Sequence, residues 1–219
     1  MTRPEPSTVD LVIFDLDGVL VDVQHAENGA LAHLAERMGL HLSVRQAAEL
    51  FSGRRLQECI DLIERMSLTT PPADAVQIVR AKCEDIIGRR IEPIDGVDYA
   101  LRRIKTTKCV ASNSPPEIIE RRLETSGIAH HFGDRRYSAY DINAWKPDPR
   151  LFLWAADDLG AQAERSVVVE DSAVGVAAGL AAGMRVLQFT GDGNTTAHPS
   201  GVLPFSSMRA LPRLVGGTL

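Results

Sequence analysis

Two pairs of carboxylates follow strongly apolar stretches of the chain, and their types and spacing could hold a metal ion. Asp15 and Asp17 come directly after the apolar run of residues 9–14, and Glu170 and Asp171 follow a second such run. Carboxylate oxygens are the hard ligands that Mg²⁺ prefers in proteins. An acidic pair beside glycine can also do no more than make a turn. The two pairs together predict a Mg²⁺ site.

A lysine and a serine could complete the chemistry around these carboxylates. Lys146 precedes Pro147, which favours extended backbone at the lysine, and Asp148 with Pro149 is typical of a helix start. Ser112 ends a further short apolar stretch. Four carboxylates in one crevice repel one another, and a divalent cation together with Lys146 offsets that charge. Because the same two cations can bind a phosphoryl group, the set predicts phosphoryl chemistry.

The elements that must position these residues are strands that end at each polar group. Short apolar runs typical of strands buried on both faces cover residues 9–14, 109–111 and 167–169. Helical stretches follow at 115–125, which begins with prolines, and at 173–182, which has Asp171 or Ser172 as its cap. This alternation predicts an α/β fold with a doubly wound parallel sheet, which binds ligands beyond the carboxyl ends of its strands. The polar groups are therefore expected to converge on one crevice.

Residues 23–92 have a different pattern, with one helical stretch after another and no strand-like run. Apolar residues recur there at helical spacing and predict a helical core formed by Leu31, Leu34, Met38, Leu56, Cys59, Ile60, Ile63, Val76, Val79, Cys83, Ile86 and Ile87. We therefore predict an inserted helical domain over residues 23–92. The α/β domain is predicted to combine residues 1–22 with residues 93–219.

In the order and placement of its motifs, the sequence resembles the haloacid dehalogenase superfamily of aspartate-nucleophile phosphotransferases. The motifs that carry the resemblance are Asp15-Leu-Asp-Gly-Val-Leu, Ser112-Asn-Ser, Lys146-Pro-Asp-Pro and Glu170-Asp-Ser-Ala-Val-Gly. The resemblance spans nearly the whole chain, and the helical insert is similar to the C1 cap of that family. Segments that begin at Phe51 and Ser138 are most similar to the sugar-phosphate and phosphogluconate phosphatases of this branch.

The resemblance implies a role for each motif residue. Asp15 would attack phosphorus and form an aspartyl-phosphate, since a carboxylate is already ionised at neutral pH. Asp17 would protonate the leaving oxygen and then deprotonate water. Ser112, with backbone N–H groups and Asn113, would hold phosphoryl oxygens, and Lys146 would orient the nucleophile and stabilise charge. The implied Mg²⁺ ligands are the Asp15 side chain, the Asp17 backbone carbonyl, Asp171 and, through water, Glu170.

Two further groups in the sequence have more than one interpretation. Arg54 and Arg55 follow Gly53 in the insert, where this family often places substrate-binding residues. They are either a solvated surface pair or, facing the crevice, a site for a carboxylate or distal phosphate of an acidic sugar derivative. The neighbours His130 and His131 make no zinc pattern and are expected to be structural or surface residues.

These observations favour a Mg²⁺-dependent phosphomonoester hydrolase that acts on a small phosphorylated metabolite, a sugar phosphate or a compound like 6-phosphogluconate. A sugar phosphomutase of the β-phosphoglucomutase type is an alternative, weakened because those relatives commonly have His where Glu27 stands. The dehalogenase branch lacks the second aspartate of the first motif, whereas this chain has it as Asp17, which argues against a dehalogenase. A non-catalytic phospho-acceptor domain uses a similar set of residues but needs neither Asp17 nor a helical insert. An EF-hand calcium loop is excluded because it would need Gly at Leu20 and Glu at Ala26.

Composition and charge set limits on the partners. The 219 residues are 44% hydrophobic, which is enough for a core, and the formal charge of −5 is spread along the chain, which argues against nucleic-acid binding. The uncharged apolar stretch 173–184 is shorter than the roughly 20 residues that cross a bilayer. The N-terminus has no apolar signal region, and the 3 cysteines are odd in number and far apart. We therefore expect a cytoplasmic protein that binds a small phosphorylated molecule, no nucleic acid and no membrane, with its oligomeric state left open.

Overall fold

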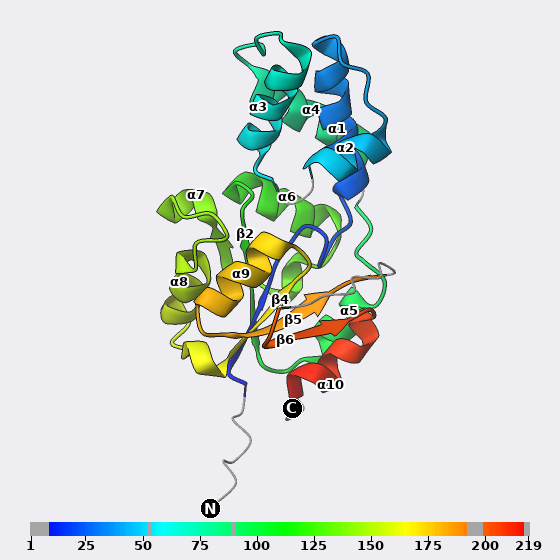
Figure 1. Cartoon of the computed structure of the whole chain (residues 1–219). Helices are drawn as coiled ribbons and strands as arrows, with labels where there is room; N and C mark the ends of the chain where they lie inside the picture. The colour runs from blue at the N-terminus through cyan, green and yellow to red at the C-terminus, as the bar shows by residue number, and fades with distance from the viewer. Residues whose placement is uncertain (1–8, 52–53, 89–90, 192–198, 217–219) are drawn as a thin grey trace, which may run out of the picture. The chain divides into compact units, whose positions relative to one another are not determined.

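The computed structural model divides the chain into two compact units (Figure 1). One unit is formed by Met1–Val21 with Glu92–Leu219, and the other by Asp22–Ile91. Each unit has its own cluster of buried apolar side chains. The residues that the structure describes are 9–51, 54–88, 91–191 and 199–216.

A six-stranded sheet forms the centre of the first unit. Its strands are β1 (Leu11–Phe14), β2 (Thr107–Ser112), β3 (Arg136–Ser138), β4 (Ser166–Glu170), β5 (Arg185–Phe189) and β6 (Val202–Phe205). They lie in the order β3-β2-β1-β4-β5-β6, and every neighbouring pair is parallel. This is the strand order of doubly wound α/β folds. The predicted α/β class with a doubly wound parallel sheet is confirmed.

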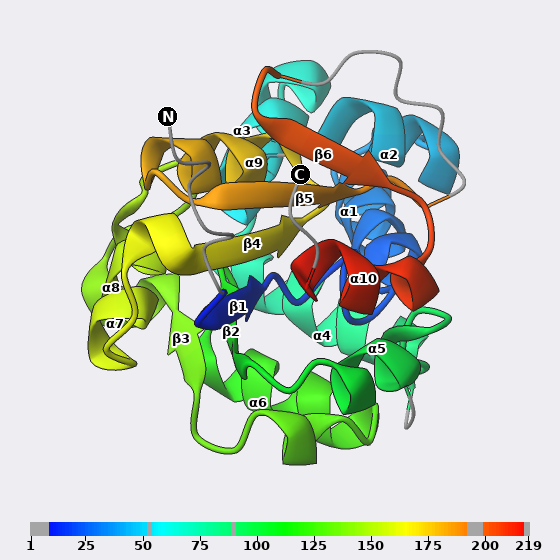
Figure 2. The same cartoon turned by 90° about the horizontal axis from the view of Figure 1, so that it is seen from below.

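Helices cover both faces of this sheet (Figure 2). α8 (Arg150–Asp158) and α9 (Ala173–Ala181) pack on one face, where Phe152 and Val176 join Ile13 in a buried cluster. On the other face lie α5 (Val97–Arg103), α6 (Pro116–Thr125) and α10 (Leu211–Gly216). Shorter helical segments are α7 (Ala139–Ile142), η1 (Ala129–His131), η2 (Ala163–Arg165) and η3 (Met208–Ala210).

The start of α9 is fixed by a serine. The Ser172 Oγ accepts a hydrogen bond from the N–H of Gly175 at 3.1 Å, so Ser172, one of the two predicted caps, is the cap residue. The cap places the first turn of α9 directly after the polar end of β4.

The central strand β1 explains why the predicted site forms where it does. All four residues of β1 are buried because helices cover both faces, and this accounts for their continuous apolar character. Phe14 pairs in register with Val110 of β2 and Val169 of β4. The chain passes from β1 to β2 and β3 on one side and returns to β4 on the other side. The carboxyl ends of β1 and β4 therefore flank the topological switch point, where α/β sheets bind ligands.

The described part of the second unit is helical, with α1 (Gln24–Arg37), α2 (Val44–Phe51), α3 (Leu56–Ser67) and α4 (Ala75–Ile87). α1 packs against both α2 and α4. The predicted core residues Leu34, Ile63 and Val79 are buried. Ile86, which helical spacing assigned to the same core, is 36% exposed, and its Cδ1 lies beside Gly29 of α1. Within the described ranges, the helices are all too short or too polar to span a bilayer.

Candidate active site

Asp15 stands at the carboxyl end of β1 and is 8% exposed. Its N–H donates to the Val169 carbonyl of β4 at 3.0 Å, so the pairing of β1 with β4 continues one residue beyond the strand. The backbone then turns at Gly18, whose φ of 89° lies in the left-handed region that glycine adopts without strain. The Gly18 N–H donates to the Val21 carbonyl at 2.8 Å and closes the turn. This turn holds Asp15 and Asp17 at the edge of the sheet.

Lys146 supplies the positive charge beside Asp15. Its Nζ lies 2.5 Å from Asp15 Oδ1 and 2.7 Å from Glu170 Oε1. The ammonium is buried and lies 4.9 Å from the centroid of the Phe152 ring. Burial works against the charged form, but the Asp15 and Glu170 carboxylates more than offset it and raise the pKa of Lys146. Lys146 is therefore a fixed cation shared between the ends of β1 and β4.

The loop that carries Lys146 is held by Asn113. The Asn113 Oδ1 accepts the N–H of Lys146 at 2.9 Å, and its Nδ2 donates to the carbonyl of Lys146 at 3.4 Å. The Lys146–Pro147 peptide bond is cis, and the Asp148 N–H donates to the Trp145 carbonyl at 2.9 Å. The family resemblance implied that Asn113 binds phosphoryl oxygens. In the structure its side-chain amide instead forms hydrogen bonds with the backbone of Lys146.

Glu170 is the last residue of β4 and Asp171 follows it, and the two complete a group of three carboxylates with Asp15. Each of the three offers an oxygen, and these oxygens lie within 4.8 Å of one another. Glu170 is buried, and its Oε2 accepts hydrogen bonds from the N–H and Oγ of Ser172 at 2.8 and 2.9 Å. We call Asp15, Lys146, Glu170 and Asp171 the strand-end cluster.

Two glycines leave the space that these carboxylates occupy. A Cβ atom at Gly18 would overlap the carboxylate of Asp171, and one at Gly175 would overlap the carboxylate of Glu170. Gly175 lies in the first turn of α9 and is buried. The absence of a side chain at these two positions is thus what allows both carboxylates to lie at the sheet edge.

The carboxylates of the strand-end cluster carry more charge than Lys146 balances. Burial raises the pKa of Asp15 to about 7 against the opposing charge of Lys146, and Glu170 adds to the rise. Burial likewise raises the pKa of Asp171 to about 8, with further contributions from Glu170 and Asp15. A divalent cation among these oxygens would offset the remaining charge and favour the ionised carboxylates. The donor set therefore fits Mg²⁺.

Asp17 has a separate set of partners. The Arg122 Nη1 of α6 lies 2.5 Å from Asp17 Oδ1, and the Ser114 Oγ donates to Asp17 Oδ2 at 3.0 Å. Ser112, buried at the end of β2, accepts the N–H of Ser114 on its Oγ at 3.0 Å. Ser114 thereby links the predicted acid/base residue to the predicted phosphoryl-binding serine.

Arg122 belongs to none of the sequence motifs, and Ser114 is the last residue of the Ser112-Asn-Ser motif but was given no role of its own there. Arg122 is 4% exposed and lies on the buried face of α6 with Ile119 and Leu123. A charged residue on the apolar face of a predicted helix is the signal that could have found it, because a buried guanidinium needs an anionic partner.

Arg54 and Arg55 belong to the helical unit, where both are exposed and have local partners. The Arg54 Nε donates to the Leu50 carbonyl at 3.0 Å, and the N–H of Arg55 donates to Glu58 Oε2 at 3.1 Å. Arg54 therefore satisfies a carbonyl near the end of α2, and Arg55 precedes the first turn of α3. Gly53, part of the same sequence motif, lies outside the described residues.

This arrangement brings together the parts of a covalent transfer reaction. The Asp15 carboxylate can act as a nucleophile, the Lys146 ammonium is a fixed cation beside it, and Asp17 is a second carboxyl group two residues away that can exchange protons. The structure brings together four of the predicted site residues, Asp15, Lys146, Glu170 and Asp171. Ser114 joins Ser112 to Asp17 by hydrogen bonds. Asn113 holds the loop that carries Lys146.

Comparison with known proteins gives a consistent result. A family model described as haloacid dehalogenase-like hydrolase matches residues 9–183. The 6-phosphogluconate phosphatase of Escherichia coli strain K12 is 31% identical to this chain over 211 residues, which cover 95% of each protein.

Solved structures match over the same extent. A conserved haloacid dehalogenase-like protein of unknown function from Agrobacterium tumefaciens strain C58 superposes with a TM-score of 0.80 at 32% identity, covering 94% of this chain and 97% of that one. A HAD family hydrolase from Deinococcus radiodurans R1, solved with bound phosphate and sodium, gives a TM-score of 0.74 at 28% identity over 96% and 97% of the two chains.

Proposed function

Because this chain belongs to the haloacid dehalogenase-like hydrolases, we propose that it is a Mg²⁺-dependent phosphatase that removes the phosphoryl group of a small sugar phosphate. The observation that carries the proposal is the strand-end cluster, in which Lys146 lies 2.5 Å from Asp15 beside Glu170 and Asp171. A carboxylate, a fixed ammonium and an oxygen-rich metal site at one sheet edge are what phosphoryl transfer through an enzyme carboxylate requires.

In the first half of the reaction, a carboxylate oxygen of Asp15 attacks phosphorus while the bond between phosphorus and the sugar oxygen breaks. The sugar oxygen takes a proton from Asp17, which leaves an aspartyl-phosphate and the free sugar hydroxyl. Lys146, in contact with Asp15 Oδ1, orients the nucleophile and stabilises charge on the phosphoryl oxygens. The Ser112 Oγ accepts the N–H of Ser114, and its own O–H remains available to donate to a phosphoryl oxygen.

In the second half, Asp17 takes a proton from water, and the water oxygen attacks phosphorus. The bond between phosphorus and Asp15 breaks, inorganic phosphate leaves, and both aspartates return to their starting states. Arg122 and Ser114 contact the Asp17 carboxylate, the form that accepts the proton, which supports this assignment.

The metal site follows from the same residues. Mg²⁺ would be held by the side chains of Asp15 and Asp171 and by the backbone carbonyl of Asp17. Both oxygens of Glu170 already accept hydrogen bonds, Oε1 from Lys146 and Oε2 from Ser172, which supports a contact through water for that residue. When bound, Mg²⁺ neutralises negative charge on the phosphoryl oxygens.

The substrate class rests on the relatives. The name 6-phosphogluconate phosphatase belongs to a protein that aligns with 95% of this chain, and the Deinococcus structure holds phosphate. We infer a small sugar phosphate as substrate, with 6-phosphogluconate as the first compound to test. The binding of a distal anion by Arg54 or Arg55 stays a prediction, as does the cytoplasmic location.

The test is release of inorganic phosphate by the full chain from a panel of sugar phosphates, 6-phosphogluconate, phosphoglycolate and nucleotides. We expect many turnovers on a sugar phosphate, loss of activity after treatment with EDTA, and recovery on adding Mg²⁺. Asp10→Asn is the matched control for Asp15→Asn, because Asp10 stands at the opposite end of the same strand and pairs with Arg165 on the surface.

Two results would overturn the phosphatase assignment. Transfer of a single phosphoryl group to each chain without release of phosphate would identify a phospho-acceptor domain. Conversion of a hexose 1-phosphate to the 6-phosphate without release would identify a mutase.

A further inference from the structure

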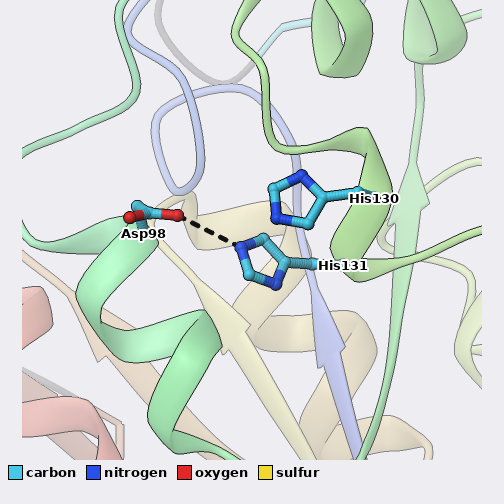
Figure 3. Close-up of side chains that lie close together, drawn as sticks. All are labelled: Asp98, His130 and His131. Atoms are coloured by element: carbon cyan, nitrogen blue, oxygen red, sulfur yellow. Dashed lines mark hydrogen bonds and ion pairs between the residues drawn. The ribbon is translucent and has the colours of Figure 1, made fainter.

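Three potential metal ligands lie together outside the strand-end cluster, on α5 and η1 of the same unit (Figure 3). They are Asp98, His130 and His131, each of which offers one ligand atom, and these atoms lie within 4.8 Å of one another. We propose that they form a site for Zn²⁺ or a similar divalent transition ion, which we call the α5–η1 site. The ion would link α5 to η1, and water would complete its coordination.

The hydrogen bond of His130 leaves its Nε2 available to bind a metal. The His130 Nδ1 lies 3.0 Å from the carbonyl oxygen of Gly127. A carbonyl only accepts, so Nδ1 must carry the proton, and Nε2 of the neutral ring then has its lone pair exposed for coordination. Histidines that bind metals commonly donate their second ring N–H to a backbone carbonyl in this way.

Asp98 and His131 are already placed at the spacing that a shared ion needs. The His131 Nε2 lies 3.2 Å from Asp98 Oδ1. Two ligands on a tetrahedral zinc, each at about 2.0–2.1 Å, stand about 3.3 Å apart. The ion would displace the proton from between these two atoms, and the neutral His131 ring would then carry its single proton on Nδ1.

The carboxylate of Asp98 is anchored by a neighbour on its own helix. The Arg102 Nε donates to Asp98 Oδ2 at 2.7 Å, which leaves Oδ1 toward His131. Such support for a ligand by a hydrogen bond from outside the site is typical of metal centres. The anchored carboxylate and the oriented His130 are two independent features that suit an ion.

The two imidazole rings lie side by side. Their centroids are 4.0 Å apart with planes inclined by 38°, and both rings are on the side of η1 that is turned toward Asp98 (Figure 3). Two imidazole nitrogens with one carboxylate oxygen favour zinc, nickel or copper over magnesium and calcium, which prefer oxygen ligands alone. Adjacent histidines give no zinc pattern in the sequence because the third ligand comes from a residue 33 positions before His131.

The experiment is calorimetric titration of the metal-stripped full chain with Zn²⁺ in the presence of excess Mg²⁺, which competes at the strand-end cluster. We expect one Zn²⁺ to bind and its affinity to fall at least about tenfold in His130→Ala and in His131→Ala. His25→Ala is the matched control, since His25 is an exposed histidine of α1 that belongs to no metal-capable group in the described part of the chain. Its affinity should equal that of the unchanged chain.

A second measurement separates this site from the strand-end cluster. Zn²⁺ should raise the Tm of the unchanged chain and of Asp171→Asn, and the rise should disappear in the two η1 variants. Equal Zn²⁺ affinity in the unchanged chain and both η1 variants would overturn the proposal. So would loss of Zn²⁺ binding in Asp171→Asn, because it would assign the ion to the strand-end cluster. Neither result depends on phosphatase activity, so the proposed function can fail while this site stands.

Discussion

The strand-end cluster and the α5–η1 site each gather three side chains that can ligate a metal in the same unit, but their chemistry differs. The first offers only carboxylate oxygens, and its Glu170 side chain is 1% exposed and bonded to Lys146. The second offers two imidazoles and one carboxylate, and its Asp98 side chain is 45% exposed. Burying three carboxylates together costs electrostatic free energy, so the first set needs nearby cations to offset its negative charge. A site in which a carboxylate acts as the nucleophile requires such cations.

The carboxyl groups of the two regions respond to their surroundings in opposite directions. Burial raises the pKa of Asp15 to about 7, whereas hydrogen bonds with His131 and Arg102 lower the pKa of Asp98. Asp98 is thus a stable anion near water, suited to hold an ion. Burial makes the charged form of Asp15 unfavourable, and the neighbouring Lys146 favours it, a balance typical of reactive carboxyl groups.

The largest effect is expected from removing the nucleophile of the strand-end cluster. Asp15→Asn keeps the size of the side chain but cannot form the aspartyl-phosphate, so kcat for phosphate release should fall by more than about a thousandfold. Asp10→Asn should retain kcat. Retention of more than about a tenth of the original kcat in Asp15→Asn would contradict covalent catalysis, while Zn²⁺ binding at the α5–η1 site should be unchanged.

The next largest effect is expected at the proton-transfer residue. Asp17→Asn should lower kcat for sugar phosphates by about a hundredfold or more, because it loses both protonation of the leaving oxygen and activation of water. With p-nitrophenyl phosphate, whose leaving group needs no proton, the first half is less affected. The aspartyl-phosphate on Asp15 should then accumulate and be detectable by acid quench and mass spectrometry. An unchanged turnover of sugar phosphates would exclude this role.

How much of the fold and of the site could be predicted from the sequence depends on how far apart in the chain the interacting residues lie. The polar ends of β1, β2 and β4 were predictable because a buried strand and the residues that follow it are encoded locally. β3 was not assigned, since its 3 residues are too short for a periodic pattern. β5 and β6 were not assigned either, and β6 contains Pro204, which a strand tolerates only at the edge of a sheet.

The contacts within the site were less predictable than the residues that form it. Asn113 and Lys146 are 33 positions apart, and their pairing depends on where two loops meet at the sheet edge. Asp17 pairs with Arg122, which stands on the buried face of α6 among apolar residues. Sequence spacing identifies residue types that can react, but the supports of those residues come from packing between distant elements.

Arg122 gives the third prediction, which tests whether that support acts on the reaction. Arg122→Met should lower kcat for sugar phosphates about tenfold, because Asp17 loses the cation 2.5 Å from its Oδ1. Arg122→Lys should recover part of the loss. For p-nitrophenyl phosphate the loss should be smaller and KM nearly unchanged. Equal losses for both substrates, together with a lower Tm, would show that Arg122 is only structural.

Asn113 gives a smaller effect and separates two roles. Asn113→Ala removes the two hydrogen bonds to the backbone of Lys146, so we expect kcat to fall about three- to tenfold and the free energy of unfolding in urea to fall by about 1–2 kcal/mol. KM should change little. A rise in KM with unchanged kcat would instead support the phosphoryl contact that the sequence predicts.

The smallest effect on catalysis is expected from the α5–η1 site. The double variant His130→Ala/His131→Ala removes the contact with Asp98, a partly exposed pair whose loss costs under about 1 kcal/mol of stability in the absence of metal. Since neither histidine belongs to the strand-end cluster, kcat with Mg²⁺ should stay within about twofold of the unchanged chain. Phosphate release measured with and without added Zn²⁺ checks this directly. A large fall in kcat under Mg²⁺ alone would show that the two regions are coupled, and the contrast between a reactive site and a linking site would no longer hold.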